Sequence, residues 1–282
     1  MRPWRRRRVL ARSGHDRHVT TSQNLSASPT RTRPRNRPDD YVLRLASSQA
    51  DVIAAQSLRY TVFALEMGAM TPGPPGLDAD DFDDLCDHVI VWHRRPGRPA
   101  EAVGTYRLLP PHSNDHQPRA TGLSTDRGFG LMPMESILDR TVEVGRACVR
   151  ADHRTGPVIP MLWRGIAAYL AQTGHRYLLG CASVPLTDGG RSAASFWDRA
   201  LLDHLAPAHR RCRPRNPVPI GRLPRAPRLV VPPLLAGYLR LGAKVCGPPA
   251  HDELFGTADF LLLLDLASVA PSHRGRVGPV GR

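Results

Sequence analysis

The strongest chemical signal in the sequence is a pair of charged residues inside an otherwise apolar segment. Glu143 and Arg146 lie in TVEVGRACV at 141–149, where a buried charge is costly unless it finds a partner. In a regular strand these two side chains would face opposite sides of the sheet. Gly145 between them tolerates a β-bulge, which would turn both side chains toward one cleft and expose backbone N–H and C=O groups to a ligand.

A second group of charges combines two arginines with an acidic loop. Arg59 lies in LRYTVF, Arg107 lies in GTYRLL, and the ten residues 78–87 contain six acids. Two interpretations are open. The arginines could pair with Asp84 or Asp87 in an ordinary ion-pair network. Alternatively, the acids could hold a cationic substrate by charge complementarity.

The hydrophobic periodicity predicts the elements that position these residues. Apolar side chains recur at three- and four-residue steps in the helical segments, and apolar runs bounded by Gly and Pro indicate strands. Strands are predicted at 41–45, 88–92, 102–109, 141–149, 177–183 and 258–266, and helices at 48–66, 160–172, 193–205 and 232–242. Polar or Pro/Arg-rich loops cover 110–130 and 206–233. This order describes a single α/β or α+β domain.

Composition separates the chain into an ordered domain and a basic tail. The net charge is +14, but eleven arginines and one acid lie within residues 1–38, which therefore account for most of it. Few large apolar residues occur there, so 1–38 is predicted to be a disordered tail. We expect one folded domain over 39–270 and a flexible tail at 271–282. No apolar run after the first arginines resembles a secretory signal.

Several function classes are disfavoured by missing motifs. The sequence has no Rossmann glycine fingerprint, P-loop, GxSxG elbow or HExxH. Its five cysteines are widely spaced without CxxC, which fits neither a disulfide framework nor a structural zinc site and indicates a cytoplasmic protein. Nucleic-acid binding is suggested by the net charge alone and is disfavoured, because most of that charge lies in the tail and aromatic residues make up only 6%.

Eight segments of the chain, taken in order, resemble a known family. LRYTVF, DFDDLCDH, VGTYRLLP, VEVGRACV, LWRGIAAYL, YLLGCASVP, PPLLAGYLRLGA and TADFLLLLDL are similar to the ornithine-lipid N-acyltransferases, over about residues 41–268. These enzymes have a GNAT-like fold, with a mixed central sheet flanked by helices, and are distantly similar to acyl-homoserine-lactone synthases. The resemblance implies transfer of a 3-hydroxyacyl group from acyl carrier protein to the α-amino group of L-ornithine, which gives lyso-ornithine lipid.

The resemblance also assigns residues. The Arg, Phe, Asp, Arg, Glu, Arg pattern of the autoinducer synthases matches, in this chain, Arg59, Phe63, Asp84 or Asp87, Arg107, Glu143 and Arg146. It implies that Asp84 and Asp87 bind the acceptor ammonium and that Arg59, Phe63 and Arg107 belong to the substrate site.

The donor loop departs from the usual GNAT pattern. Such loops cradle the pyrophosphate of coenzyme A with several glycines before a helix. Here the loop contains Arg154, Gly156 and Pro157, and proline removes one amide donor. We therefore expect Cys148, Arg154 and Gly156 to contact a carrier-bound phosphopantetheine, which has no ADP to cradle.

The expected chemistry is direct attack of an amine on a thioester. Glu143 is the expected base, acting directly or through one water, and Arg146 is assigned with it to the catalytic pair. A backbone N–H within 146–148 would stabilise the oxyanion. A covalent acyl-enzyme on Cys148 or Cys181 is the less favoured route, because no activating histidine is evident. No metal and no further cofactor are expected.

Partners follow from charge. Residues 204–251 contain eight Arg, one Lys and no acid, which suits either an acidic acyl carrier protein or an anionic membrane surface. A peripheral position on the inner face of the membrane is therefore an alternative to a purely cytoplasmic one. The rival functions are an autoinducer synthase, a basic binding protein without activity, and an inactive GNAT-like interaction protein.

Overall fold

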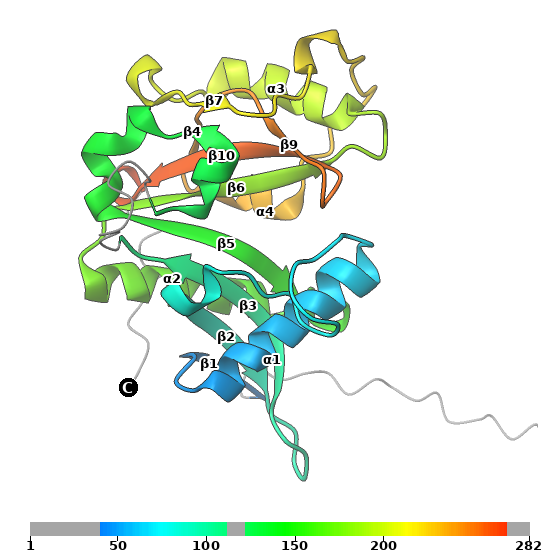
Figure 1. Cartoon of the computed structure of the whole chain (residues 1–282), viewed down its shortest axis with the longest axis vertical. Helices are drawn as coiled ribbons and strands as arrows, with labels where there is room; N and C mark the ends of the chain where they lie inside the picture. The colour runs from blue at the N-terminus through cyan, green and yellow to red at the C-terminus, as the bar shows by residue number, and fades with distance from the viewer. Residues whose placement is uncertain (1–39, 112–121, 270–282) are drawn as a thin grey trace, which may run out of the picture. The chain divides into compact units, whose positions relative to one another are not determined.

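The computed structural model describes residues 40–111 and 122–269, and they form one large mixed sheet with helices on both faces (Figure 1). The strand order is β1-β2-β3-β5-β6-β10-β8, and β9 also pairs with β10. The sheet strands are β1 (Tyr41–Leu45), β2 (Asp87–His93), β3 (Glu101–Leu109), β5 (Thr141–Val149), β6 (Tyr177–Pro185), β8 (Lys244–Val245), β9 (Ala250–Asp252) and β10 (Thr257–Asp265). A separate pair consists of β4 (Phe129–Gly130) and β7 (Arg213–Pro214). The tails predicted at 1–38 and 271–282 lie outside the described residues.

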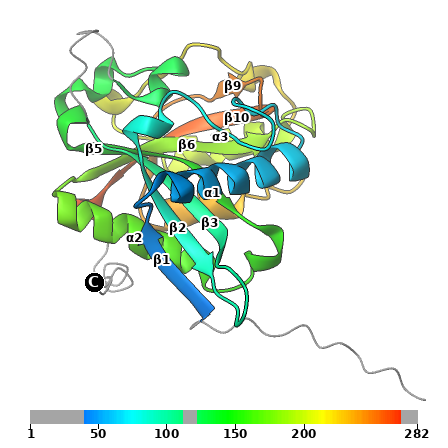
Figure 2. The ribbon, with the colours of Figure 1, turned by 60° about the horizontal axis from the view of Figure 1, so that its bottom comes forward.

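The helices divide between the two faces of the sheet. They are α1 (Gln49–Tyr60), α2 (Val158–Thr173), α3 (Arg191–Asp203) and α4 (Pro233–Arg240). Leu162, Phe196 and Leu235, from α2, α3 and α4, join one core with alternate residues of the central strands. Figures 1 and 2 show α1 on the opposite side of β2 and β3 from α2. The charged segments found in the sequence all lie on the face that α1 covers.

The face opposite α2 has its own apolar support. Leu109, Leu179 and Leu261 pack there against a 3₁₀ helix, Met132–Arg140, which was not predicted from the sequence. A smaller cluster under α1 contains Leu58, Val62, Phe63 and Cys148. The charged residues thus lie between two apolar clusters, in surroundings where desolvation governs their chemistry.

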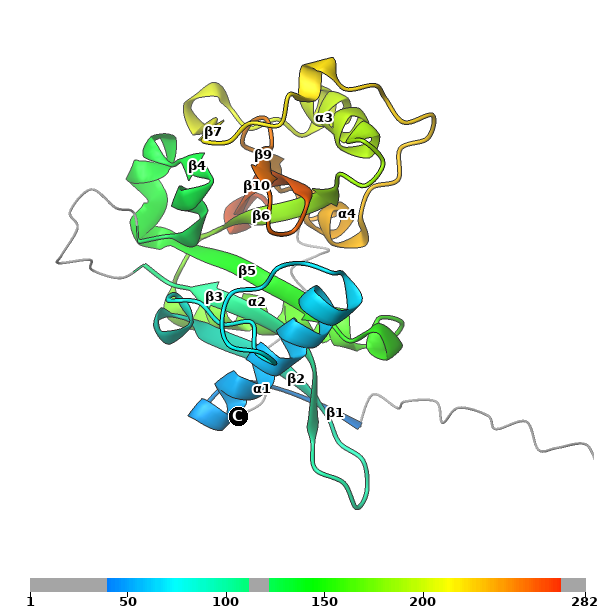
Figure 3. The same cartoon turned by 45° about the vertical axis from the view of Figure 1, so that its right-hand side comes forward.

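The two parallel strands at the centre separate after a short paired stretch. Only Thr141, Val142 and Glu143 of β5 are in register with β6. Figure 3 shows the two strands close together at one end and apart at the other. Gly180 of β6 lies where the pairing ends, and a Cβ on it would overlap the carbonyl oxygen of Val144. Glycine there permits the close approach of the two strands before they diverge.

Most of the predicted elements are present. The strands predicted at 41–45 and 141–149 have those bounds, and the other long strands differ by a few residues. The predicted helix at 48–66 is α-helical only to Tyr60 and continues as a π-helical segment, Thr61–Glu66. The short strands β4, β7, β8 and β9 were not predicted. No helix in the described part of the chain combines the length and hydropathy needed to cross a bilayer.

Candidate active site

β5 contains the bulge that the sequence predicted. Thr105 of β3 pairs with Cys148, but Arg107, two residues on, pairs with Gly145, so β5 has one extra residue between these pairs. Arg146 takes up the irregularity with φ 49°, in the left-handed region that non-glycine residues rarely adopt. The bulge turns Arg146 toward the α1 face, on which Glu143 also lies.

Arg59 and Arg107 form the centre of a buried ion-pair network. Arg59 is 0% exposed, and its Nε lies 2.9 Å from Oδ2 of Asp78, while its Nη2 lies 2.7 Å from Oδ2 of Asp83. Nη1 of Arg107 lies 2.5 Å from Oδ1 of Asp80 and 3.3 Å from Oδ1 of Asp83. The network holds the acidic loop against α1 and β3.

Arg146 joins the same network from the bulge. Its Nη2 lies 3.2 Å from Oδ2 of Asp80, and its Nε lies 3.6 Å from Oδ2 of Asp78. The Arg146 side chain remains 18% exposed, unlike that of Arg59 at 1%. Arg146 is therefore the arginine of the network that a ligand can reach most readily.

The acidic partners differ from those expected. Asp84 and Asp87 are both exposed, and Asp87 accepts a hydrogen bond of 2.7 Å from the hydroxyl of Tyr169 on α2. Of the two interpretations, an ion-pair network does form, but the acids named for it are wrong, because the side chains of Asp84 and Asp87 lie outside the network. The loop turns inward earlier, at Asp78, Asp80 and Asp83, and six acids in ten residues gave no basis for choosing among them.

The three inward-facing acids do not share one electrostatic environment. For each acid, burial is the largest single contribution and acts to raise the pKa, while the nearby arginines act to lower it. Hydrogen bonding and charge from Arg59 outweigh burial at Asp83 and lower its pKa to about 2. Arg107 does the same at Asp80, whose pKa is lowered. Burial prevails at Asp78, whose pKa is raised.

Glu143 is held by two residues that sequence reasoning missed. It is 4% exposed. Oε1 accepts a hydrogen bond from the hydroxyl of Ser124, and Oε2 accepts from the backbone N–H and the hydroxyl of Thr125, at 3.1 and 3.0 Å. Burial raises the pKa of Glu143 despite these bonds and the charge of Arg107. A carboxyl with a raised pKa is better matched to accepting a proton near neutral pH.

Glu143 and Arg146 share a face but not a partner. Glu143 accepts hydrogen bonds from Ser124 and Thr125, whereas Arg146 pairs with the acidic loop at Asp80. Glu143 and Arg146 thus lie on the same face, as predicted, but the contacts of the described residues include no ion pair between them. Ser124 and Thr125 lie in a segment read only as a polar loop, where no periodic pattern could single them out.

Phe63 lies in the π-helical segment and contributes an aromatic wall. The backbone N–H of Met67 bonds to the carbonyl of Val62, five residues earlier, at 3.0 Å, and such turns are frequent at functional sites. The rings of Phe63 and Phe255 meet edge to face with centroids 5.4 Å apart. The guanidinium carbon of Arg146 lies 5.4 Å from the centre of the Phe255 ring. Phe255, which the sequence gave no reason to select, thus links the bulge to the turn before β10.

Neither tempting cysteine is poised for covalent chemistry. Burial raises the pKa of Cys148 to about 12, and it raises that of Cys181 as well. Both therefore stay protonated, and the thiol is a weaker nucleophile than the thiolate.

The loop before α2 contains Arg154 and Gly156. Nε of Arg154 donates to the carbonyl of Val149 at 3.0 Å, and its Nη1 lies 2.5 Å from Oε1 of Glu66. Gly156 is exposed, and a Cβ there would meet nothing within 4 Å. The start of α2 offers backbone N–H groups suited to an anion, although Pro160 supplies none. Within the described ranges no three His, Cys, Asp or Glu side chains form a metal-binding group.

Comparisons with known proteins found a matching domain model, relatives and similar solved structures. A family model described as an acetyltransferase (GNAT) domain matches residues 58–164. An L-ornithine N(alpha)-acyltransferase of Rhodobacter capsulatus is 35% identical over 250 residues, which cover 84% of this chain and 94% of the relative. One from Brucella abortus is 31% identical over 254 residues, covering 82% and 86%. A solved CoA-dependent acyl-homoserine lactone synthase aligns with 86% of this chain and 91% of its own, at 16% identity and a TM-score of 0.49.

The sheet, its bulged strand and the matched domain define the class: the chain is an N-acyltransferase with a GNAT fold. The predicted fold class is thereby confirmed. More narrowly, the chain belongs to the L-ornithine N(alpha)-acyltransferase family, because several relatives above 30% identity are covered over most of their length.

Proposed function

We propose that this enzyme transfers a 3-hydroxyacyl group from an acyl carrier protein to the α-amino group of L-ornithine, which gives lyso-ornithine lipid. The names of the relatives support the acceptor. The observation that carries the proposal is the separation of β5 and β6 immediately after Glu143. Because of this separation, the bulged part of β5 has no β6 partner on that side. The unpaired edge begins next to Glu143, whose pKa is raised.

The chemistry is an exchange of a C–S bond for a C–N bond. Glu143 takes a proton from the ammonium, directly or through one water, because only the free amine can attack. The amine then attacks the thioester carbonyl, and a backbone N–H within 146–148 stabilises the oxyanion, a contribution of about 3 kcal/mol when preorganised. Collapse breaks the C–S bond, and the departing sulfur receives a proton as the pantetheine thiol.

The donor site is proposed at the α2 end of the separated strands. Gly156 and the first N–H groups of α2 would approach the single phosphodiester of phosphopantetheine. Cys148 is buried nearby on β5 and would contribute packing rather than reactivity. Prolines at 157 and 160 reduce the number of amide donors, which suits a donor without a pyrophosphate.

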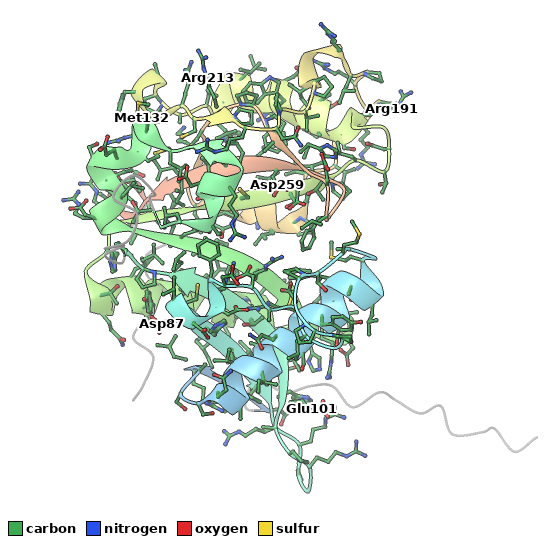
Figure 4. All side chains as sticks on the ribbon, viewed as in Figure 1. Asp87, Glu101, Met132, Arg191, Arg213 and Asp259 are labelled. Carbon is green, nitrogen blue, oxygen red and sulfur yellow. The ribbon has the colours of Figure 1, made fainter. Side chains whose placement is uncertain are left out.

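A basic surface supports an acidic carrier as the donor. Four exposed arginines of the 206–240 region have no ion pair or hydrogen bond of their side chains with the described residues: Arg213, Arg222, Arg228 and Arg240. Figure 4 shows Arg213 extending outward beyond β10. Unpaired surface charge of one sign accelerates encounter with a partner of opposite charge.

The donor and acceptor are tested together with purified protein. A 3-hydroxyacyl carrier protein or the same acyl-CoA is offered as donor, a panel of amino acids and S-adenosylmethionine are offered as acceptors, and products are identified by mass spectrometry. The proposal predicts an amide of ornithine formed faster from the carrier than from coenzyme A. Formation of an acyl-homoserine lactone from S-adenosylmethionine, or of no amide at all, would refute it.

The basic surface has its own test. Reversing the charges of Arg213, Arg222 and Arg228 to Glu should slow turnover with the acyl carrier but not with acyl-pantetheine, which lacks the carrier surface. If the variant keeps the wild-type rate with both donors but no longer binds anionic vesicles, the surface is a membrane contact instead.

A further inference from the structure

Asp259 is a half-buried acid on the reactive face that the mechanism above leaves without a role. It lies in β10, in register with Ser183 of β6 on one side and Ala250 of β9 on the other. Alternation along β10 places it on the same face as Leu261, whose cluster includes Leu179, the partner of Glu143. Figure 4 shows Asp259 in the central part of the structure, unlike the peripheral Asp87 and Glu101.

No cation in the described part of the chain forms an ion pair with this carboxyl. The hydroxyl of Thr257 donates to Oδ1 of Asp259 at 2.7 Å, and within residues 40–111 and 122–269 no Arg, Lys or His forms an ion pair with it. Burial raises the pKa of Asp259, and the charge of Asp252 raises it further, while hydroxyl hydrogen bonds and the more distant Arg146 lower it. A carboxylate in such a position is costly unless it meets a positive charge.

Asp259 and Glu143 lie on either side of the same stretch of β6. Glu143 pairs with Leu179 and Asp259 pairs with Ser183, four residues on, which is about 13 Å along a strand. Because β5 and β10 flank β6, two strand spacings of about 5 Å add to this, and the two Cα atoms lie about 16 Å apart. Between them lies Cys181, whose pKa is raised chiefly by burial and then by the charges of Asp259 and Glu143. Both carboxyls therefore act on one region of the reactive face.

The span suits a diamino acid with two methylenes between its amine-bearing carbons, as in ornithine. The two nitrogens of extended ornithine are about 6 Å apart by standard bond lengths. A hydrogen bond of about 3 Å at each end brings the distance between the two acceptor oxygens to about 12 Å. A carboxylate oxygen lies about 4 Å (Asp) to 5 Å (Glu) from its own Cα atom, so oxygens about 12 Å apart are within the reach of two such side chains whose Cα atoms are about 16 Å apart.

We propose that Asp259 selects the acceptor: its carboxylate binds the side-chain ammonium of a diamino acid while the α-amine faces Glu143. The assignment rests on the proposed acyl transfer to ornithine and adds the residue that distinguishes ornithine from neutral amino acids. Holding the distal ammonium also keeps that amine charged and away from the thioester, so only the α-amine is acylated.

The test compares ornithine with norvaline, which has the same carbon chain and no side-chain amine. Asp259→Asn should lower kcat/KM for ornithine about 100-fold, as expected for loss of one partner of a largely buried charge pair, and leave that for norvaline unchanged. Asp265→Asn is the matched control, since Asp265 lies on the same strand and pairs with Arg176 at the surface. It should leave the ratio of the two kcat/KM values as in wild type.

A second variant separates recognition from a purely structural role. Asp259→Glu extends the carboxylate by one methylene and should shift preference toward 2,4-diaminobutyrate, which is one methylene shorter than ornithine. A structural defect would lower activity with both diamino acids equally, and this variant also carries the test if Asp259→Asn does not fold.

Three results would overturn the assignment. An unchanged ratio of ornithine to norvaline in Asp259→Asn, or an unshifted length preference in Asp259→Glu, would remove Asp259 from acceptor recognition while leaving the acyl transfer intact. A wild-type enzyme with equal kcat/KM for norvaline and ornithine would also remove Asp259 from acceptor recognition. Wild-type enzyme that acylates no amino acid would instead overturn the proposed function, and this assignment with it.

Discussion

Arg59 and Asp83 form an ion pair with 2.7 Å between Nη2 and Oδ2, and their side chains are only 1% and 3% exposed. Arg59→Met would leave Asp83 and Asp78 buried without this charge, so we expect the free energy of unfolding to fall by about 3–5 kcal/mol. Urea unfolding measures the change. Arg176→Met is the control, because Arg176 pairs with Asp265 at the surface, where loss of an ion pair costs about 0–1 kcal/mol. Equal losses in the two variants would contradict a buried network.

The pH dependence of stability follows from the same pair. The carboxyl of Asp83 has a pKa of about 2 in the folded protein against an ordinary 3.8. Below about pH 4 the unfolded chain therefore binds the proton more readily, and the free energy of unfolding should fall as the pH drops toward 2. Asp83→Asn should flatten this part of the curve. The ¹³C shift of the Asp83 carboxyl reports its titration directly, and a midpoint near 4 in the folded protein would contradict the pairing.

At position 146 in the bulge, we predict that glycine is more stabilising than alanine. Arg146 has φ 49°, a conformation that costs L-residues about 1–2 kcal/mol. Arg146→Gly and Arg146→Ala both lose the guanidinium, so the difference between them isolates the backbone. We expect the glycine variant to be the more stable by about 1 kcal/mol in urea unfolding. At Ala147, which has no positive φ, substitution by glycine should destabilise instead, and a loss at both positions would argue against the bulge geometry.

Part of this site could be predicted from the sequence because local pattern is sufficient there. Two charges and a glycine inside an apolar run indicate a bulged strand, and the structure has the bulge at Gly145–Cys148. The inward-facing acids could not be chosen, because loop residues follow no period and their burial depends on Arg59 and Arg107 from distant elements.

Other features lay beyond sequence reasoning for different reasons. The π-helical segment Thr61–Glu66 changes the hydrogen-bond spacing without changing the apolar pattern that predicted a helix. The strands β4, β7 and β8 have two residues each, too few for alternation to appear. Ser124 meets Glu143 across a long stretch of chain, so only the tertiary fold reveals that contact.

The cysteines should be dispensable for acyl transfer. Burial keeps the thiols of Cys148 and Cys181 protonated, so a double substitution by alanine should retain activity within about tenfold of wild type. Removal of a true covalent nucleophile costs as much as about 10⁶-fold. Intact-protein mass spectrometry with acyl donor and no acceptor should show no acyl adduct. An adduct that disappears in the double variant would establish the covalent route.

The most direct test of the account is the rate of a single turnover by Glu143→Gln. The isosteric amide can keep hydrogen bonding with Ser124 and Thr125 but cannot accept the ammonium proton, so we predict a rate about 10²- to 10⁴-fold lower. Glu135→Gln, an exposed neighbour in the same region, should react at the wild-type rate. A folded Glu143→Gln enzyme that forms the ornithine amide as fast as wild type would contradict the role of Glu143 as the proton acceptor.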